Sequence, residues 1–382
     1  MPLELLWLLL PVAAASGWFA ARRAPARRGA GDMHIEPEYF KGINYLLNEQ
    51  PDKAIEVLLQ IVQIDSETVE PHFALGNLFR RQGEVDRAIR IHQNLIARPL
   101  LTRAQRSRAM FELGRDYYQA GLLDRAENLF RDIADSDPKN LEALRLLGSI
   151  YEQENEWEKA IAVTSALEGS RAVLANYYCE LAAQALAAGD HARVKKMLRR
   201  AYFKDRRCVR ASLLTAELAC AEGRLRAAIK ALQRVSKQDP QYLSEVVAPL
   251  LRCYDQIGRP EQAIEYLAPA LRRQGAFPPV VLFADHLAHH RGRAEARHYV
   301  ASYLQYHPSL PGLAHLLEWL ARDDSVERGQ DLELGGRVMA KLLENIPMYH
   351  CINCGFRGKS MRWQCPGCRQ WNTVRPYQGQ TL

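Results

Sequence analysis

Residues 110–138 read MFELGRDYYQAGLLDRAENLFRDIADSDP, and close variants of this stretch recur along most of the chain. Two antiparallel helices can cross closely only where small residues lie at their contact, and Gly114 and Ala126 are residues of this kind. Gly121 lies between them, where a glycine lets the chain turn at the end of a helix. The stretch therefore predicts a helical hairpin.

The small residue of the first helix keeps a constant period along the chain. It recurs as Gly42, Gly76, Gly114, Gly148, Ala182 and Ala216. The spacing is 34 residues, except for one step of 38 that includes four extra residues in the polar loop 98–106. With Leu113, Tyr117, Phe130 and Pro138 in register, the pattern resembles the tetratricopeptide repeat.

Toward the C-terminal end the repeats become irregular. Leu251 and Asp285 replace the small residue in the seventh and eighth copies, and Arg297 replaces the alanine of the second helix. We expect seven to eight repeats in residues 37–309 and capping helices in residues 310–346, because the last apolar face of an array must be covered. The predicted fold class is an all-α tetratricopeptide solenoid, preceded by a transmembrane helix and followed by a small metal ribbon.

The charge balance gives little support for nucleic-acid binding. The 382 residues carry a formal net charge of +7, and four of these charges come from arginines in residues 22–36, a segment that we interpret as a basic linker. These arginines are Arg22, Arg23, Arg27 and Arg28. They fit an orienting charge cluster and also a lipid-binding one.

Residues 5–21, LLWLLLPVAAASGWFAA, are apolar and predict a membrane-spanning helix within residues 1–21. A signal peptide is disfavoured because the N-terminal flank carries Glu4 and no Lys or Arg. The arginines lie on the other flank, which the positive-inside rule places in the cytoplasm. We therefore expect a single-pass membrane protein with most of its chain on the cytoplasmic side.

The most specific chemical pattern lies in residues 347–382, where CINC and CPGC supply Cys351, Cys354, Cys365 and Cys368. Ten residues separate the two pairs, which is enough for a hairpin that closes a tetrahedral four-thiolate site. We expect one zinc ion, with iron as the alternative, in a rubredoxin-like ribbon. Because protein ligands fill all four positions, a hydrolytic role is disfavoured.

Further cysteines and histidines outside the ribbon are interpreted as structural residues rather than metal ligands. Single cysteines at four helical positions are expected to be buried and structural, and these are Cys179, Cys208, Cys220 and Cys253. Four histidines have near-helical spacings without an H-E-x-x-H frame, so a metal site is disfavoured there. These are His286, His289, His290 and His298.

The second repeat, LGNLFRRQGEVDRAIRIHQ at residues 75–93, is the candidate partner-binding surface. Its polar side chains are expected to be exposed, and they are Asn77, Arg80, Arg81, Arg87, Arg90 and His92. Such a set could clamp an acidic segment. It also fits an ordinary solvated face.

The apolar N-terminus LELLWLLLPVAAASGW, the repeats and the terminal WQCPGCRQW together resemble the lipopolysaccharide assembly protein B (LapB) family over essentially the whole chain. The resemblance implies a non-catalytic inner-membrane adaptor that faces the cytoplasm. It would act with an FtsH-type membrane protease to promote degradation of the UDP-acyl-N-acetylglucosamine deacetylase, with a further link to lipopolysaccharide transport proteins. It also implies that the four ribbon cysteines bind metal and that the ribbon packs on the array.

No catalytic motif of the G-x-S-x-G, P-loop, G-x-G-x-x-G or H-E-x-x-H type is present, so we expect no enzyme activity. The alternative within the binding class is a scaffold that couples lipopolysaccharide synthesis to transport. A redox or metalloenzyme role of the four-cysteine centre is a third hypothesis. Nucleic-acid binding through the ribbon is disfavoured by the membrane tether.

Overall fold

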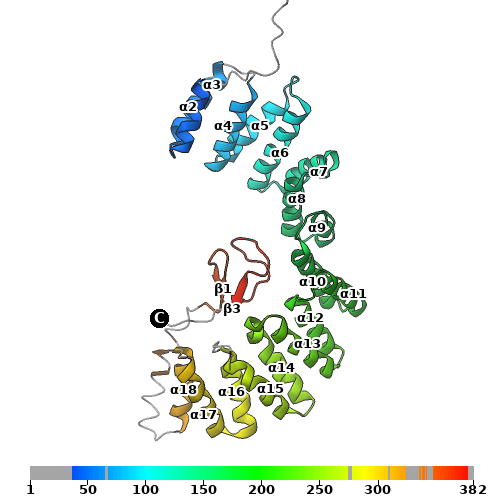
Figure 1. The fold of residues 1–382 in the computed structure, drawn as a ribbon, viewed down its shortest axis with the longest axis vertical. Helices are drawn as coiled ribbons and strands as arrows, with labels where there is room; N and C mark the ends of the chain where they lie inside the picture. The colour runs from blue at the N-terminus through cyan, green and yellow to red at the C-terminus, as the bar shows by residue number, and fades with distance from the viewer. Residues whose placement is uncertain are drawn as a thin grey trace, which may run out of the picture. The chain divides into compact units, whose positions relative to one another are not determined.

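The computed structural model describes residues 37–64, 68–273, 278–308, 310–323, 335–336, 338–339, 341 and 347–376 (Figure 1). The expected transmembrane helix and basic linker lie outside these residues. Within the described part, no helix combines the length and the apolar character needed to cross a membrane. The chain divides into two compact units, Met1–Ile133 and Ala134–Leu382, and each is described by itself.

The first unit consists of consecutive helical hairpins. Its helices are α2 (Pro37–Leu47), α3 (Pro51–Ile64), α4 (Val69–Arg81), α5 (Val85–Ile96), α6 (Arg103–Gln119) and the larger part of α7 (Leu123–Ser136). The extra residues of the long step form the connection between α5 and α6. There Thr102 caps α6, because its hydroxyl accepts from the backbone N–H of Gln105, whose side chain in turn accepts from the backbone N–H of Thr102.

The second unit continues the hairpins and adds the ribbon. Its helices are α8 (Leu141–Gln153), α9 (Trp157–Thr164), α10 (Arg171–Ala187), α11 (His191–Lys204), α12 (Val209–Ala221), α13 (Leu225–Gln238), the short η2 (Pro240–Tyr242), α14 (Leu243–Gln256), α15 (Pro260–Arg272), α16 (Pro278–Arg291), α17 (Arg293–Tyr306) and α18 (Leu310–Asp323). α18 packs on α16 and α17, within the segment expected to cap the array.

The predicted turns and close helix contacts are confirmed. Gly121 has φ 75°, and Asn155 takes the same left-handed conformation with φ 58° at the equivalent turn of the next repeat. At the helix crossing, a Cβ added to Gly114 would lie 2.7 Å from the ring of Phe130, which is fully buried. The repeat period in the sequence therefore reflects the close helix crossing at Gly114 and the left-handed turns between helices.

The C-terminal ribbon is a three-stranded antiparallel sheet in the order β2-β1-β3. Its strands are β1 (Tyr349–Cys351), β2 (Arg357–Gly358) and β3 (Val374–Pro376). Tyr349 pairs with Gly358 on one side and with Pro376 on the other. The ribbon packs against the helices of the second unit, and this contact positions the candidate site (Figure 1).

Outside the ribbon, the expected burial is confirmed for Cys179, Cys208 and Cys253, and the four cysteines lie in two close pairs. Cys179 and Cys208 have sulfurs 3.8 Å apart, and Cys220 and Cys253 have sulfurs 3.5 Å apart. All four are free thiols, and Cys220 is exposed. The expectation of burial is therefore wrong for Cys220 alone, and the stacking of repeats brings cysteines of different helices together.

Candidate metal centre

Four cysteines of the ribbon converge on one point. Their sulfur atoms all lie within 4.8 Å of one another, with Sγ–Sγ distances of 3.7 Å between Cys351 and Cys368 and 3.6 Å between Cys354 and Cys365. A tetrahedron with metal–sulfur bonds of about 2.3 Å has edges of about 3.8 Å. The sulfurs therefore already have the spacing of a four-thiolate metal site, and zinc is the ion that such a site favours.

Each cysteine pair lies in a tight turn that aims backbone N–H groups at sulfur. In the first knuckle, Gly355 has φ 75° and donates to the carbonyl of Cys351 over 3.0 Å. Burial raises the pKa of the Cys351 thiol, but hydrogen bonds with Thr373 and with the N–H groups of Cys354 and Asn353 lower it to about 6. These groups favour the thiolate, which is the form that binds metal.

The second knuckle requires a glycine for a different reason. A Cβ added to Gly367 would lie 3.3 Å from the sulfur of Cys354 and 3.9 Å from that of Cys365. In the same turn, the N–H of Arg369 donates to the carbonyl of Cys365 over 2.8 Å. The chain therefore passes close to the metal position, where a side chain would crowd the ligands.

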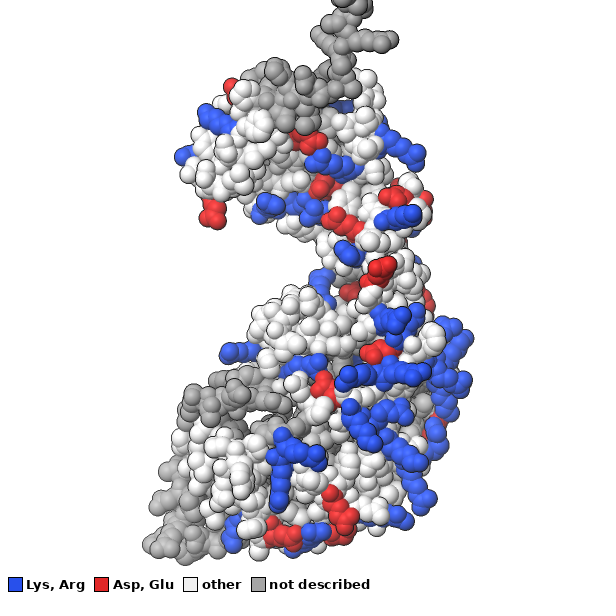
Figure 2. Space-filling model, viewed as in Figure 1, with Lys and Arg blue, Asp and Glu red and all other residues white. Residues whose placement is uncertain are grey.

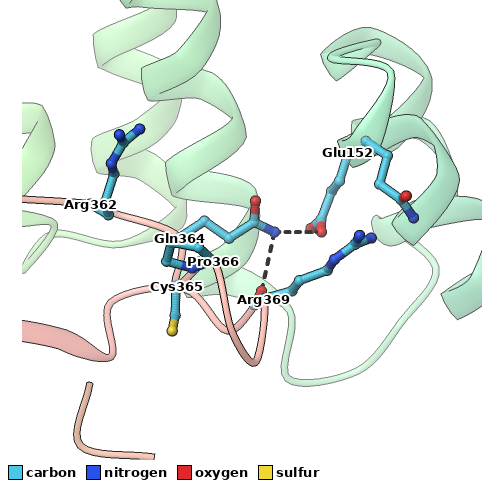
Figure 3. A pocket seen from close by; sticks show the side chains of 7 residues that line it. Glu152, Arg362, Gln364, Cys365, Pro366 and Arg369 are labelled. Atoms are coloured by element: carbon cyan, nitrogen blue, oxygen red, sulfur yellow. Dashed lines mark hydrogen bonds between the residues drawn. The ribbon is translucent and has the colours of Figure 1, made fainter. Parts of the chain in front are cut away.

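Glu152, near the end of α8, is the first anchor of the ribbon. Its carboxylate accepts from Gln364 Nε2 at 2.8 Å (Figure 3). It also accepts from Trp371 Nε1 at 3.0 Å and from the hydroxyl of Tyr177. The ring of Trp371 lies edge-on to those of Trp157 and Tyr177. Burial and the neighbouring carboxylate raise the pKa of Tyr177, so this hydroxyl remains a donor.

A second set of contacts anchors the opposite part of the ribbon. Tyr349 donates to Glu245 Oε1 over 2.6 Å, and Arg375 pairs with Asp239. Trp363 stacks on Tyr242, with ring centroids 5.5 Å apart. The ribbon is thus held on both sides by buried aromatic rings and carboxylates.

A polar pocket of about 310 Å³ lies where the second knuckle meets α8 (Figure 3). Its lining includes Glu152, Gln364 and Arg369, and Gln364 Nε2 donates both to Glu152 and to the carbonyl of Arg369. Cys365, itself one of the four metal ligands, and Pro366 also line the pocket. The pocket therefore depends on the metal site for its shape.

The expected exposure of the partner-binding residues in the first unit is wrong for Arg80 and His92. Arg80 donates to Glu112 at 2.5 Å and to Asp116 at 2.8 Å, and His92 Nδ1 lies 2.5 Å from the other oxygen of Asp116. Both Asp116 and His92 have no exposed surface. His92 packs against Gly76 just as Phe130 packs against Gly114, so it is an internal residue of the repeat.

The other candidate partner-binding residues are at least partly exposed, as expected. Asn77 is half-buried and accepts from Arg80 at 2.5 Å. Arg81, Arg87 and Arg90 are exposed. Arg87 lies over the ring of Phe79 at 3.9 Å from its centroid. Of the six residues, these three arginines are therefore the ones that remain exposed on the second repeat.

Sequence reasoning missed the acidic anchors of the ribbon, namely Glu152, Asp239 and Glu245. Each lies at or near a helix end, where acidic residues are common, and none has a motif that indicates its partner. The aromatic residues around the cysteines were the only available signal. Trp363 and Trp371 are too large to be buried inside so small a ribbon, so they had to pack on another surface.

Comparison with known proteins agrees with this structure. The tetratricopeptide repeat family matches residues 72–104, 111–172 and 185–248, and the rubredoxin metal binding domain matches residues 349–376. Among solved structures, the C-terminal part of a TPR repeat-containing protein from Cytophaga hutchinsonii is 12% identical, covers 71% of this chain and 96% of that chain, and has a TM-score of 0.40.

Two relatives align over nearly the full chain. Lipopolysaccharide assembly protein B of Escherichia coli strain K12 is 37% identical over 384 residues, covering 99% of both chains. That of Haemophilus influenzae is 33% identical over 395 residues, again covering 99% of both. The repeats and these relatives indicate a non-catalytic protein with a four-cysteine metal site. With this identity over its whole length, the chain belongs to the lipopolysaccharide assembly protein B family.

Proposed function

We propose that this protein is a membrane-tethered adaptor in lipopolysaccharide assembly that presents a substrate protein to a protease. The names of the full-length relatives support the pathway. The protease would be of the FtsH type, and the substrate would be the UDP-acyl-N-acetylglucosamine deacetylase. A role in coupling to lipopolysaccharide transport proteins is the alternative.

The observation that carries the proposal is the docking of the metal ribbon on the repeat helices. The carboxylates of three array residues each bind a ribbon side chain by a hydrogen bond or an ion pair. These residues are Glu152, Asp239 and Glu245. The four cysteines leave no coordination position for a substrate. The metal therefore braces a binding surface, and repeat arrays of this kind act by binding other proteins.

Membrane proximity is supported by charge as well as by the apolar N-terminus. Residues 191–238 contain 14 Lys and Arg but only three Asp and Glu. Figure 2 shows these basic side chains gathered over α11 and α13. Anionic head groups of the cytoplasmic leaflet attract such clusters by about 1 kcal/mol per charge near the surface.

For the partner contact we propose the exposed arginines of the second repeat, Arg81, Arg87 and Arg90. Asn77, Arg80 and His92 would stabilise the repeat that carries them, since Asn77 accepts from Arg80 while Arg80 and His92 bind the buried Asp116. Guanidinium groups in this arrangement suit an acidic segment of a partner protein.

Affinity capture of the full-length protein from gently solubilised membranes tests the proposal. The wild-type protein is expected to recover the protease and the deacetylase, and the Cys351→Ser/Cys354→Ser variant is expected to recover much less of both. Cys220→Ser is the matched control, because it removes an exposed thiol outside the ribbon. Recovery of transport proteins without the protease would instead favour the scaffold. Equal recovery by the ribbon variant and the wild type would remove the bracing role of the metal.

A further inference from the structure

A second group of metal-ligand side chains lies far from the four cysteines in sequence. Asp255 is in the last turn of α14, and His286 and His290 are one helical turn apart near the end of α16. One ligand atom from each lies within 4.8 Å of the others. Spacing by four residues places two imidazoles on the same face of a helix, which is a common way to bind one metal ion.

The distances within this group fit metal coordination better than hydrogen bonding. Asp255 Oδ2 lies 3.6 Å from His286 Nδ1, and Asp255 Oδ1 lies 3.4 Å from His290 Nε2. Hydrogen bonds between nitrogen and oxygen are usually 2.7–3.2 Å long. Ligands at about 2.1 Å from a tetrahedral ion are about 3.4 Å apart, which is close to both separations, each of which involves a different oxygen of the Asp255 carboxylate.

Burial shows which side of the group is fixed and which is open. The side chain of His286 is only 8% exposed, whereas those of His290 and Asp255 are 25% and 43% exposed. His286 is held by the packing of α16, whose buried Phe283 and Leu287 lie in the same core as Leu250 and Leu251 of α14. The exposed side leaves access for an ion and for water as a further ligand.

We propose that Asp255, His286 and His290 form a second metal site that binds a divalent transition ion of the zinc class. Two imidazoles and one carboxylate are ligands that Zn²⁺ accepts readily. Acidic and basic neighbours surround the group, since Glu261 of α15 pairs with Arg291 at 2.5 Å and the ring of His289 lies 4.8 Å from that of His290. The bound ion would join α14 to α16.

This location gives the site a structural purpose. The seventh and eighth repeats lack the small residue at the helix crossing, where Leu251 and Asp285 stand instead. A metal ion that joins the first helices of these two repeats would strengthen the array where its repeat pattern is weakest. The histidines alone did not predict the site, because the third ligand comes 31 residues before His286 on another helix.

Metal content of the full-length protein, with all four ribbon cysteines intact, provides the test. After equilibration with zinc and removal of loose metal, we expect two zinc ions per wild-type chain and one in Asp255→Asn and in His286→Gln/His290→Gln. His289→Gln is the matched control and is expected to keep two. The variants should bind the second zinc at least about 10-fold more weakly, since even the loss of groups that only support a ligand weakens metal sites by 10–100-fold.

Cobalt substitution distinguishes the two sites and reports on folding. The four-cysteine site gives thiolate-to-cobalt charge-transfer absorption, and this band should be unchanged in all variants if they fold. The second equivalent of cobalt should add only weak bands without thiolate character, and only where Asp255 and the two histidines are present. One metal ion per wild-type chain, or a second ion retained equally by Asp255→Asn, would overturn the proposal.

Discussion

The carboxylate of Glu152 in α8 accepts a hydrogen bond of 3.0 Å from Nε1 of Trp371, a residue that follows it by 219 positions. Glu152→Ala would leave the donors of Trp371, Gln364 and Tyr177 without this acceptor. We expect docking of the ribbon to weaken by roughly 2–3 kcal/mol. Hydrogen exchange of residues 349–376 measures this effect.

Glu158→Ala is the matched control for that experiment. Glu158 lies in the next helix, and its ion pair with Arg193 is exposed on both sides. Exposed pairs contribute little, so exchange in the ribbon should be unchanged. Equal protection of the ribbon in Glu152→Ala and in the wild type would contradict the anchoring role.

The buried network of the second and third repeats predicts a large loss of stability in Asp116→Ala. This change would leave His92 and one nitrogen of the Arg80 guanidinium without the carboxylate that binds them. The side chains of Asp116 and His92 have no exposed surface. Breaking a buried pair in this way lowers the free energy of unfolding by about 3–5 kcal/mol. Urea denaturation measures it, with Glu70→Ala as the control, because the pair of Glu70 with Arg108 is exposed. Similar midpoints for the two variants would refute the buried network as a source of stability.

The glycines at helix crossings predict opposite results for two substitutions. Gly114→Ala places a Cβ 2.7 Å from the ring of Phe130, whereas Gly42→Ala places one 3.5 Å from Leu58. Overpacking of roughly 1–3 kcal/mol should exceed the helix-propensity gain of about 1 kcal/mol at Gly114. Gly42→Ala should instead leave stability unchanged or raise it by up to about 1 kcal/mol. Thermal unfolding compares the two, and stabilisation by Gly114→Ala would show that the crossing can open.

Tyr299 predicts a loss of stability at alkaline pH. Burial raises the pKa of Tyr299 to about 12, in spite of the nearby Arg272 that lowers it. Between pH 10 and 12 the unfolded chain releases this proton while the folded chain keeps it, so the free energy of unfolding falls by up to about 1.4 kcal/mol per pH unit. Tyr299→Phe should flatten this part of the stability curve. Tyr306→Phe is the control, because its ring is 81% exposed, and the same flattening there would contradict the assignment.

Removal of the ribbon metal should undock the ribbon without melting the helices. Among the described residues of the ribbon, the buried members of its hydrophobic cluster are Cys351, Cys365 and Val374, too few to hold three short strands without an ion. A strong chelator should therefore change the fluorescence of Trp363 and Trp371 while far-ultraviolet circular dichroism stays nearly constant. The Cys351→Ser/Cys354→Ser variant should show no further change with chelator. A ribbon that stays protected after loss of its metal would be inconsistent with this account.

The repeats could be predicted from sequence because each steric requirement of the fold selects the residue type at a single position. A close helix crossing requires a small side chain, and a left-handed turn favours glycine or asparagine, so Gly114, Gly121 and Asn155 each indicate their own geometry. The ligands of the four-cysteine site were predictable for the same reason. Two cysteines separated by two residues in a tight turn are suited to metal binding whatever surrounds them.

Side chains whose roles depend on distant partners were not predictable in this way. Glu152 and Asp255 look like ordinary surface acids, and only the folded chain brings them to Trp371 and to His286. His92 was expected to be exposed because it is polar. Its place in the period is equivalent to that of Phe130, and that correspondence indicated an internal position.

The long separation between Glu152 and Trp371 also has a consequence for biogenesis. Each hairpin forms from neighbouring residues, so the array can fold step by step as it leaves the ribosome, which is a process of low contact order. The ribbon contacts close a loop of 219 residues and require a segment that is synthesised after the repeats, together with its metal. Docking of the ribbon is therefore the step that completes folding of this protein. A chain that lacks the ribbon or its metal would retain folded repeats while leaving its ribbon-binding surface uncovered.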